Sequence, residues 1–139
     1  LAELLDNGKA LEKFTQWIEA QGGDPRVAED GSLLEVSPET EELTASRGGW
    51  VQSINTRQLG VAANTLGAGR LKSDDEVDLS VGLIVHKKPG ERVEQGEPLV
   101  TIHHRQGKNL AEAKKLIEGA YVIEQVETDP LPLILDTVR

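Results

Sequence analysis

Apolar residues recur at helical spacing near the start of the chain. After Asn7, which can cap a helix, apolar side chains follow at intervals of three and four residues and form one stripe. The members of this stripe are Ala10, Leu11, Phe14, Trp17 and Ile18. Gln21-Gly22-Gly23 then ends the pattern with glycine in its usual place after a helix. Because Leu1 to Leu5 has the pattern of a helix tail, we predict two helices before residue 24.

Two more helices are predicted further along the chain. The first covers Gln58 to Leu66 and ends at Gly67. The second follows Asn109, a candidate cap, and its inner face carries Leu110, Ala113, Leu116 and Ile117. Ala120 to Val126 comes next and alternates between apolar and polar residues, which predicts a strand.

Strand patterns also flank a glycine turn in the middle of the chain. Glu42 to Ser46 and Trp50 to Thr56 surround Arg47-Gly48-Gly49, which predicts a β-hairpin. At the other end, Leu131 to Leu135 is predicted as an edge strand, because Pro132 cannot donate a ladder hydrogen bond. Residues 24–41, which are acidic and rich in turn residues, are predicted to be a linker.

One segment crosses between two apolar strands by way of two bends. Val81 to Val85 is the first strand and Pro98 to Ile102 the second. Pro89-Gly90 suits a type II turn, Gly96 makes the second bend, and Val93 is the one apolar residue between them. This spacing is typical of a β-hammerhead, in which one chain bends twice to change sheets. We therefore predict an α+β fold, an α/β-hammerhead with a mixed, twisted sheet and covering helices.

Composition narrows the functional classes. The chain has 139 residues and a net charge of −9, which argues against a nucleic-acid surface. It has no cysteine, which excludes disulfides, and no apolar run long enough to cross a membrane or to act as a signal peptide. We expect a cytoplasmic protein with no membrane partner. Because the chain contains no methionine and starts at Leu1, we also expect it to be a piece of a longer protein.

The loop Gly67-Ala68-Gly69-Arg70 is the first candidate site. A phosphate-binding glycine loop leads into a helix N-terminus, where free N–H groups meet the anion. These glycines instead follow a predicted helix and stand at its carbonyl end, and Arg70 is the one residue of the loop that could contact an anion. A helix cap that leads into a mobile loop is therefore the favoured interpretation.

Other candidate sites have weaker patterns. His103 and His104 are adjacent on a strand and point to opposite faces, so we expect exposed histidines, His86 included, and no metal site. Asp74-Asp75-Glu76 with Asp78 lacks the glycine and the bidentate glutamate of a calcium loop and is expected to be a solvated acidic turn. Lys108 precedes a helix, whereas the modified lysine of a biotinyl or lipoyl carrier stands at a hairpin tip. No catalytic residue set is found.

Several ordered motifs resemble one enzyme family, pyrimidine-nucleoside phosphorylase, a relative of thymidine phosphorylase. The motifs are Gly8-Lys9-Ala10-Leu11-Glu12-Lys13-Phe14, Ala20-Gln21-Gly22-Gly23-Asp24, Leu66-Gly67-Ala68-Gly69-Arg70, Asp78-Leu79-Ser80-Val81-Gly82-Leu83 and Gly90 to Leu99. The resemblance covers nearly the whole chain and is strongest to the C-terminal part of these enzymes.

The resemblance implies a function in pyrimidine salvage. Family enzymes are cytoplasmic pentosyltransferases and homodimers that convert a pyrimidine nucleoside and phosphate into free base and (deoxy)ribose 1-phosphate. They need no cofactor, since inorganic phosphate is a co-substrate. Residues 1–23 would be a helical remnant of the parent α/β domain, 24–41 a linker and 42–139 the C-terminal α/β-hammerhead domain.

The same resemblance places the main binding groups in the earlier helical and α/β domains, which would be this chain's partners. The loop Gly67-Ala68-Gly69-Arg70 would approach the substrate cleft when the enzyme closes, and the fragment alone would be inactive. Two alternatives stay open. One is a cofactor carrier, and the other is a stand-alone binding or oligomerisation module that uses the Phe14/Trp17 stripe.

Overall fold

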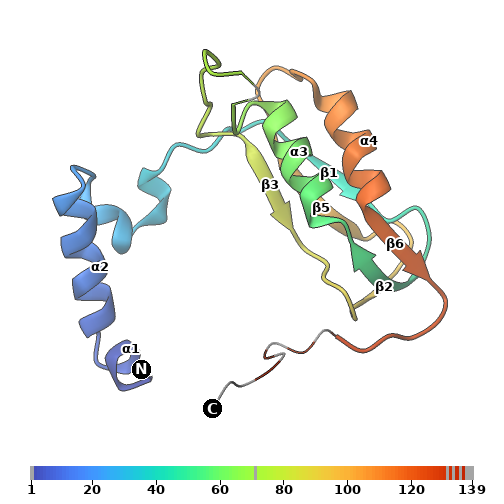
Figure 1. Ribbon diagram of the computed structural model, residues 1–139, viewed down its shortest axis with the longest axis horizontal. Helices are drawn as coiled ribbons and strands as arrows, with labels where there is room; N and C mark the ends of the chain where they lie inside the picture. The colour runs from blue at the N-terminus through green and yellow to red at the C-terminus, as the bar shows by residue number, and fades with distance from the viewer. Residues whose placement is uncertain (1, 71, 131, 133, 135, 137–139) are drawn as a thin grey trace. The chain divides into compact units, whose positions relative to one another are not determined.

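The computed structural model describes residues 2–70, 72–130, 132, 134 and 136. They divide into two compact units, Leu1–Glu35 and Val36–Arg139. The first unit contains α1 (Ala2–Asp6), α2 (Lys9–Ala20) and two short 3₁₀ helices, η1 (Pro25–Ala28) and η2 (Gly31–Leu33). The second contains six strands and two helices (Figure 1).

The predicted helices of the first unit are confirmed. Gly8, rather than Asn7 as expected, is the N-cap residue of α2, although the Asn7 side chain accepts a hydrogen bond from the Lys9 N–H at 3.1 Å. The helix ends at Ala20, with Gln21 as its C-cap. No residue of α2 is buried: Phe14 and Trp17, whose ring centroids are 6.0 Å apart, are 45% and 59% exposed. The rest of the first unit therefore leaves these two rings of the stripe largely exposed.

The strands of the second unit form two three-stranded sheets (Figure 1). One has the order β1-β5-β3 and the other β4-β2-β6. The strands are β1 (Thr40–Thr44), β2 (Gly49–Ile54), β3 (Gly82–Val85), β4 (Arg92–Val93), β5 (Pro98–His103) and β6 (Tyr121–Glu124). All four pairings among the described residues are antiparallel, so the α+β class is confirmed, but two antiparallel sheets replace the mixed sheet that we expected.

The predicted β-hairpin between residues 42 and 56 is wrong. β1 pairs with β5, whereas β2 pairs with β4 and β6 in the other sheet. Beyond β1, Ala45 donates to the Glu97 carbonyl at 2.9 Å and accepts from the Gly96 N–H at 2.8 Å, so its backbone partners lie in the crossing. Gly49 then opens β2 at φ 151°, close to the Glu124 carbonyl of β6. The glycines thus turn the chain from one sheet into the other.

The two bends of the crossing are confirmed. At the first, the Glu91 N–H donates to the Lys88 carbonyl at 3.1 Å around Pro89 and Gly90, and Gly90 has φ 91°. Val93, between the bends, is 1% exposed and faces the core, as its pattern predicted. The crossing carries the chain from β3 in one sheet, through β4 in the other, to β5 in the first. The hammerhead name for this arrangement stays a prediction.

Two helices lie side by side against the strands, α3 (Thr56–Leu66) and α4 (Leu110–Ala120) (Figure 1). The Asn55 side chain caps α3 by accepting from the Gln58 N–H at 3.1 Å. Asn109 precedes α4 at φ 55°, but its side chain does not cap that helix as expected. It donates instead to the Thr65 carbonyl in the last turn of α3, at 2.8 Å, and so joins the two helices.

The core of the second unit is aliphatic and lies between the helices and the sheets. Its largest fully buried side chains are Ile102, Ile117, Val51, Val93 and Val100. Burying each such side chain contributes about 1.5–3 kcal/mol. The predicted terminal strand, residues 131–135, falls largely outside the described residues.

Candidate functional site

The predicted loop at Gly67 begins where α3 ends, as the sequence predicted. The Gly67 N–H donates to the Asn64 carbonyl at 3.0 Å and the Ala68 N–H to the Ala63 carbonyl at 3.1 Å, the pair of bonds that defines a Schellman cap. Gly67 has φ 112°, a conformation that L side chains rarely adopt. The loop therefore leaves the carbonyl end of the helix, where the backbone repels anions.

The other end of the loop returns to its start. The Asp78 N–H donates to the Gly67 carbonyl at 2.9 Å and closes residues 68–77 into a loop with adjoining ends. Within it, the Lys72 N–H donates to the Asp75 carboxylate at 2.8 Å and the Asp75 N–H to the Lys72 carbonyl at 3.2 Å. We call residues Gly67–Asp78 the glycine loop.

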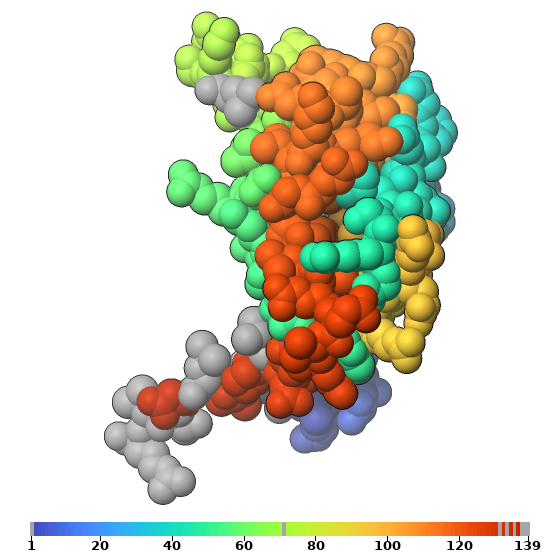
Figure 2. Space-filling model, turned by 90° about the vertical axis from the view of Figure 1, so that its right-hand side faces the viewer, coloured from blue at the N-terminus to red at the C-terminus, as the bar shows by residue number. Residues whose placement is uncertain are grey.

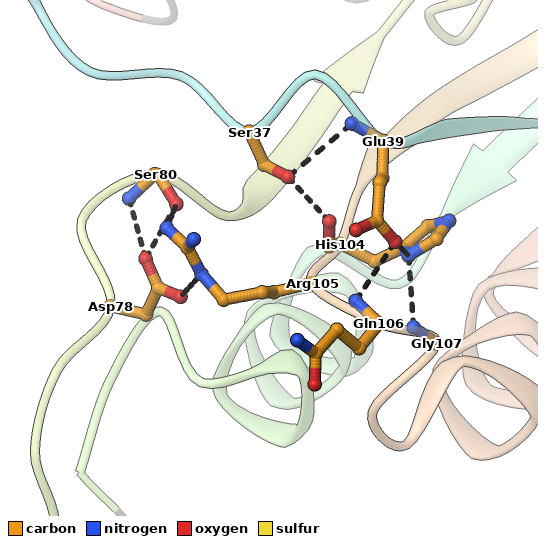
Figure 3. Close-up of polar contacts among 8 residues, drawn as sticks. All are labelled: Ser37, Glu39, Asp78, Ser80, His104, Arg105, Gln106 and Gly107. Atoms are coloured by element: carbon orange, nitrogen blue, oxygen red, sulfur yellow. Dashed lines mark hydrogen bonds and ion pairs between the residues drawn. The ribbon is translucent and has the colours of Figure 1, made fainter.

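A cluster of polar side chains holds the returning end of the glycine loop (Figure 3). The Asp78 carboxylate accepts from the Ser80 N–H at 3.0 Å, the Ser80 hydroxyl at 2.6 Å and the Arg105 Nε at 2.8 Å. Arg105 also donates through Nη2 to the Ser80 hydroxyl at 2.7 Å. The Arg105 guanidinium and the Ser80 donors hold the pKa of the Asp78 carboxyl well below its usual range. Asp78, predicted as part of a solvated acidic turn, is thus a structural anchor.

Ser37 ties this cluster to the sheet (Figure 3). It is 3% exposed, its N–H donates to the Ser80 carbonyl at 2.8 Å, and its hydroxyl donates to the His104 carbonyl at 2.5 Å. Its own carbonyl lies 3.1 Å from His103 Nδ1. Ser80 is equally buried, at 3% exposed. The loop end, the segment before β1 and the end of β5 are therefore one hydrogen-bonded unit.

His103, the last residue of β5, and His104, the next residue, are half-buried rather than exposed as predicted. His104 Nδ1 lies 3.4 Å from the Glu39 carboxylate and accepts from the Gly107 N–H at 3.2 Å. The same carboxylate accepts from the Gln106 N–H at 2.8 Å (Figure 3). The side chains of Glu39 and His104 therefore fix the turn that follows β5. His86, by contrast, is exposed and bonds Thr101 at 2.7 Å.

An open pocket of about 500 Å³ lies beside the glycine loop. It is lined by residues of the loop, of the last turn of α3 and of the segment before α4: Asn64, Thr65, Gly67, Gly69, Lys72, Asp74, Asp75, Glu76, Lys108 and Asn109. Two lysines face three carboxylates around it, so the pocket carries both signs of charge. Lys108 lines this pocket in a turn before α4 and stands at no hairpin tip, as the sequence suggested.

Of the four predicted loop residues, the first three are half-buried and the fourth is exposed. Gly67, Ala68 and Gly69 are half-buried, and Ala68 packs against the core. The Arg70 side chain is exposed and bonds to none of the described residues. The ends of the loop are thus held by hydrogen bonds, and the Arg70 guanidinium on the loop is open to solvent. The anchor Arg105 was missed, since its partner Asp78 stands 27 positions away and no spacing rule links them.

A second open cavity, of about 510 Å³, lies between β1, the turn after it, α4 and β6. Figure 2 shows the face on which α4 and β6, in orange and red, run beside the turquoise segment that includes β1. Leu43, Leu99 and Ile123 are among its lining residues, with Arg47 and Glu118. Tyr121 also lines it, and burial, with the nearby Glu91 carboxylate, raises the pKa of Tyr121 to about 12.

The described residues contain no group of three or more His, Cys, Asp or Glu that could hold a metal ion. None of their helices is long and apolar enough to cross a membrane. Among the same residues, no Ser or Thr hydroxyl bonds a histidine ring that is held in turn by a carboxylate. What the site offers is a glycine loop with a fixed base and an available arginine.

Comparison with known proteins gives one consistent result. The family model described as "Pyrimidine nucleoside phosphorylase C-terminal domain" matches residues 50–124. A pyrimidine-nucleoside phosphorylase of Bacillus subtilis (strain 168) is 46% identical over 103 residues, which cover 74% of this chain and 24% of the relative. One of Staphylococcus haemolyticus (strain JCSC1435) is 39% identical over 130 residues, covering 94% and 30%. The chain spans less than a third of the length of these relatives.

Proposed function

Because this chain belongs to the pyrimidine-nucleoside phosphorylase family and matches its C-terminal domain, we propose that it works as that domain within a phosphorylase. The enzyme would convert a pyrimidine nucleoside and inorganic phosphate into free base and (deoxy)ribose 1-phosphate. Phosphate is a co-substrate in this reaction, and no cofactor is required.

The domain's proposed contribution is closure of the substrate cleft. Phosphorolysis needs cationic and hydrogen-bonding groups on the phosphate and the base, and the described residues gather no such set. Closure needs a loop that is held at its base and projects a group toward the substrate. The glycine loop supports this role, because Asp78 fixes its base and Arg70 is exposed on it.

The partners would be the preceding helical and α/β domains of the same enzyme. The apolar stripe of α2 supports this proposal, since Phe14 and Trp17 are 45% and 59% exposed. A stripe of this size on one amphipathic helix is normally covered by another element. The earlier α/β domain would supply that cover, and the enzyme would be a cytoplasmic homodimer, as the family resemblance suggests.

The role of Arg70 is tested in the full-length enzyme with two matched arginine variants. Arg57, in the first turn of α3, is also exposed and stands about ten residues of helix, roughly 15 Å, from the loop. Arg70→Ala should lower turnover of uridine about tenfold or more without changing the unfolding temperature, whereas Arg57→Ala should leave both unchanged. Unchanged kinetics in Arg70→Ala would leave Arg70 as a surface residue and would remove the closing role.

The assignment of the domain is tested by complementation. The 139-residue chain alone should release no uracil from uridine and phosphate, and activity should appear when the proposed preceding domains are added. Activity in the chain alone would mean that a catalytic site lies within it. If the full-length enzyme is also inactive, the stand-alone binding module with the α2 stripe as its interface becomes the better interpretation.

A further inference from the structure

We propose that Arg105 is a positioning residue for this reaction, because it locks the returning end of the glycine loop to the sheet and so sets where the loop can reach. This inference rests on the proposed function. Arg105 lies outside the loop, 27 positions beyond Asp78, and nothing in the loop's own sequence predicts its involvement.

The loop depends on its base for order. Residues 72–74 and 76 are exposed, so the middle of the loop adds little to the packed core. The Asp78 N–H closes the base on the Gly67 carbonyl at 2.9 Å. Few buried contacts and exposed backbone are the usual marks of a segment that opens at low cost in free energy. The attachments at the base therefore decide how well the loop holds one position.

The geometry at Arg105 requires a guanidinium. Nε reaches Asp78 Oδ2 at 2.8 Å while Nη2 of the same plane reaches Ser80 Oγ at 2.7 Å. A lysine ammonium is a point charge and cannot place two donors in this fixed fork. The fork holds Asp78 and Ser80 in one arrangement, and Ser80 continues through its carbonyl to the buried Ser37.

The lock is attached to a rigid element. Arg105 stands two residues after the end of β5, the central strand of the sheet β1-β5-β3. The neighbouring His104 is held on both sides, by its N–H to the Glu39 carbonyl at 3.0 Å and by its carbonyl to the Ser37 hydroxyl. Because β5 is paired along both edges as far as His103, the segment that carries Arg105 starts from a fixed strand end. Hydrogen bonds through Arg105 thus fix the end of the loop to the end of β5.

Misplacing a substrate-facing loop by about 1 Å can cost up to 100-fold in rate, because reacting groups no longer meet in the required geometry. Loss of the Arg105 fork should act on turnover in this way. It should also loosen the glycine loop itself, an effect that can be measured without any reference to catalysis.

The experiment uses the full-length enzyme with Arg105→Ala, Arg105→Lys and Arg92→Ala. Arg92 is the matched control, since it pairs with Glu94 at 2.9 Å on the same domain but is mostly exposed and outside the loop. Hydrogen exchange of the amides of residues 68–77 and the rate of tryptic cleavage after Arg70 and Lys72 report loop order. kcat and KM for uridine at saturating phosphate report the reaction.

The expected result is faster exchange and cleavage in both Arg105 variants, with kcat about tenfold lower in Arg105→Ala and only partly restored in Arg105→Lys. Arg92→Ala should match the parent enzyme in every readout. Unchanged loop exchange in Arg105→Ala would overturn the lock, and a loosened loop with unchanged kcat would overturn the positioning role. If Arg105→Ala does not fold, Arg105→Lys gives the same two comparisons.

Failure of the proposed function would look different from failure of this inference. In that case the unmodified enzyme would show no phosphorolysis of uridine, thymidine or deoxyuridine. The loop readouts would still test the lock, while the positioning role would fall together with the function on which it rests.

Discussion

Replacing Gly49 by alanine should destabilise this domain far more than the addition of one methyl group usually does. Gly49 opens β2 at φ 151°, and a Cβ at this position would overlap the Glu124 carbonyl oxygen of β6. It would also lie 3.0 Å from the Glu124 carbonyl carbon and 3.1 Å from Ile123 Cγ2. Real Cβ atoms essentially never come closer than 3.0 Å to another atom, as the contact with the carbonyl oxygen would require. The chain must therefore shift where β2 pairs with β6.

The cost has two parts. Holding alanine in a backbone conformation that suits glycine costs about 1–3 kcal/mol. Displacing β6 to relieve the overlap disturbs the Trp50–Glu124 pair and the packing of Ile123, which is 6% exposed, and overpacking of this kind costs about 1–3 kcal/mol. The sum, about 2–5 kcal/mol, is a large share of the roughly 5–15 kcal/mol that stabilises a typical domain.

Gly60→Ala is the matched control, because it adds the same methyl group with the opposite expectation. Gly60 lies inside α3, and its Cβ would meet nothing within 4 Å. Alanine there should stabilise the protein by about 0.5–1 kcal/mol.

Urea unfolding of the 139-residue chain, followed by circular dichroism, gives both free energies of unfolding. A Gly49→Ala variant within about 0.5 kcal/mol of the parent would refute the close approach of β2 to β6. If both variants destabilised the protein equally, the effect would not come from the geometry at Gly49.

Three further predictions concern the core and the titrating groups. Ile117→Ala should lower the free energy of unfolding by about 2–5 kcal/mol in urea titrations, because Ile117 is 0% exposed, and a loss below 1 kcal/mol would contradict that burial. Because Arg105 and Ser80 lower the pKa of Asp78, its carboxylate stabilises the fold above the unfolded pKa near 4, and this contribution is lost as pH falls. Asp78→Asn should therefore flatten the dependence of the urea midpoint on pH below about 5. An unchanged slope would show that the Asp78 carboxylate does not stabilise the fold. Tyr121 is the only tyrosine of the chain and its pKa is raised to about 12, so stability should fall as pH rises above about 10, where the unfolded phenol ionises first; an ultraviolet titration of the folded chain with a midpoint near 10 would contradict this.

The elements that could be predicted from the sequence are those with local causes. The stripe of α2, the Gln58–Leu66 part of α3 and the turn at Pro89-Gly90 each depend on residues within a few positions of one another. Thr56, predicted as the end of a strand, begins α3 instead. Val93 could be placed in the core because it is the one apolar residue in a charged crossing. In these segments the local pattern and the tertiary structure agree.

The prediction failed where the sequence signal had two possible meanings. Arg47-Gly48-Gly49 between two strand patterns suits a hairpin turn, but the same glycines also let a chain pass from one sheet into another. The choice between the two depends on pairing with Glu97 and Glu124, which lie far along the chain. No local pattern contains that information.

The anchor of the glycine loop was missed for the same reason. Ser37, Asp78 and Arg105 come from three separate segments, and each is an ordinary surface residue type. Asn109 was recognised as a residue at a helix start, but its side chain bonds the neighbouring helix at Thr65. Hydrogen bonds between distant segments follow from the assembled fold and could not be derived before it.

The pairing pattern of the strands has a consequence for how this domain could be trimmed or synthesised. The family match begins at residue 50, yet β1, at Thr40–Thr44, pairs along β5. A chain that started at residue 50 would leave β5 as an open edge, with backbone groups free to recruit a strand from another molecule, so it should aggregate. During synthesis β1 and β2 would likewise wait unpaired for partners made late in the chain, which makes folding slow and dependent on protection of those edges.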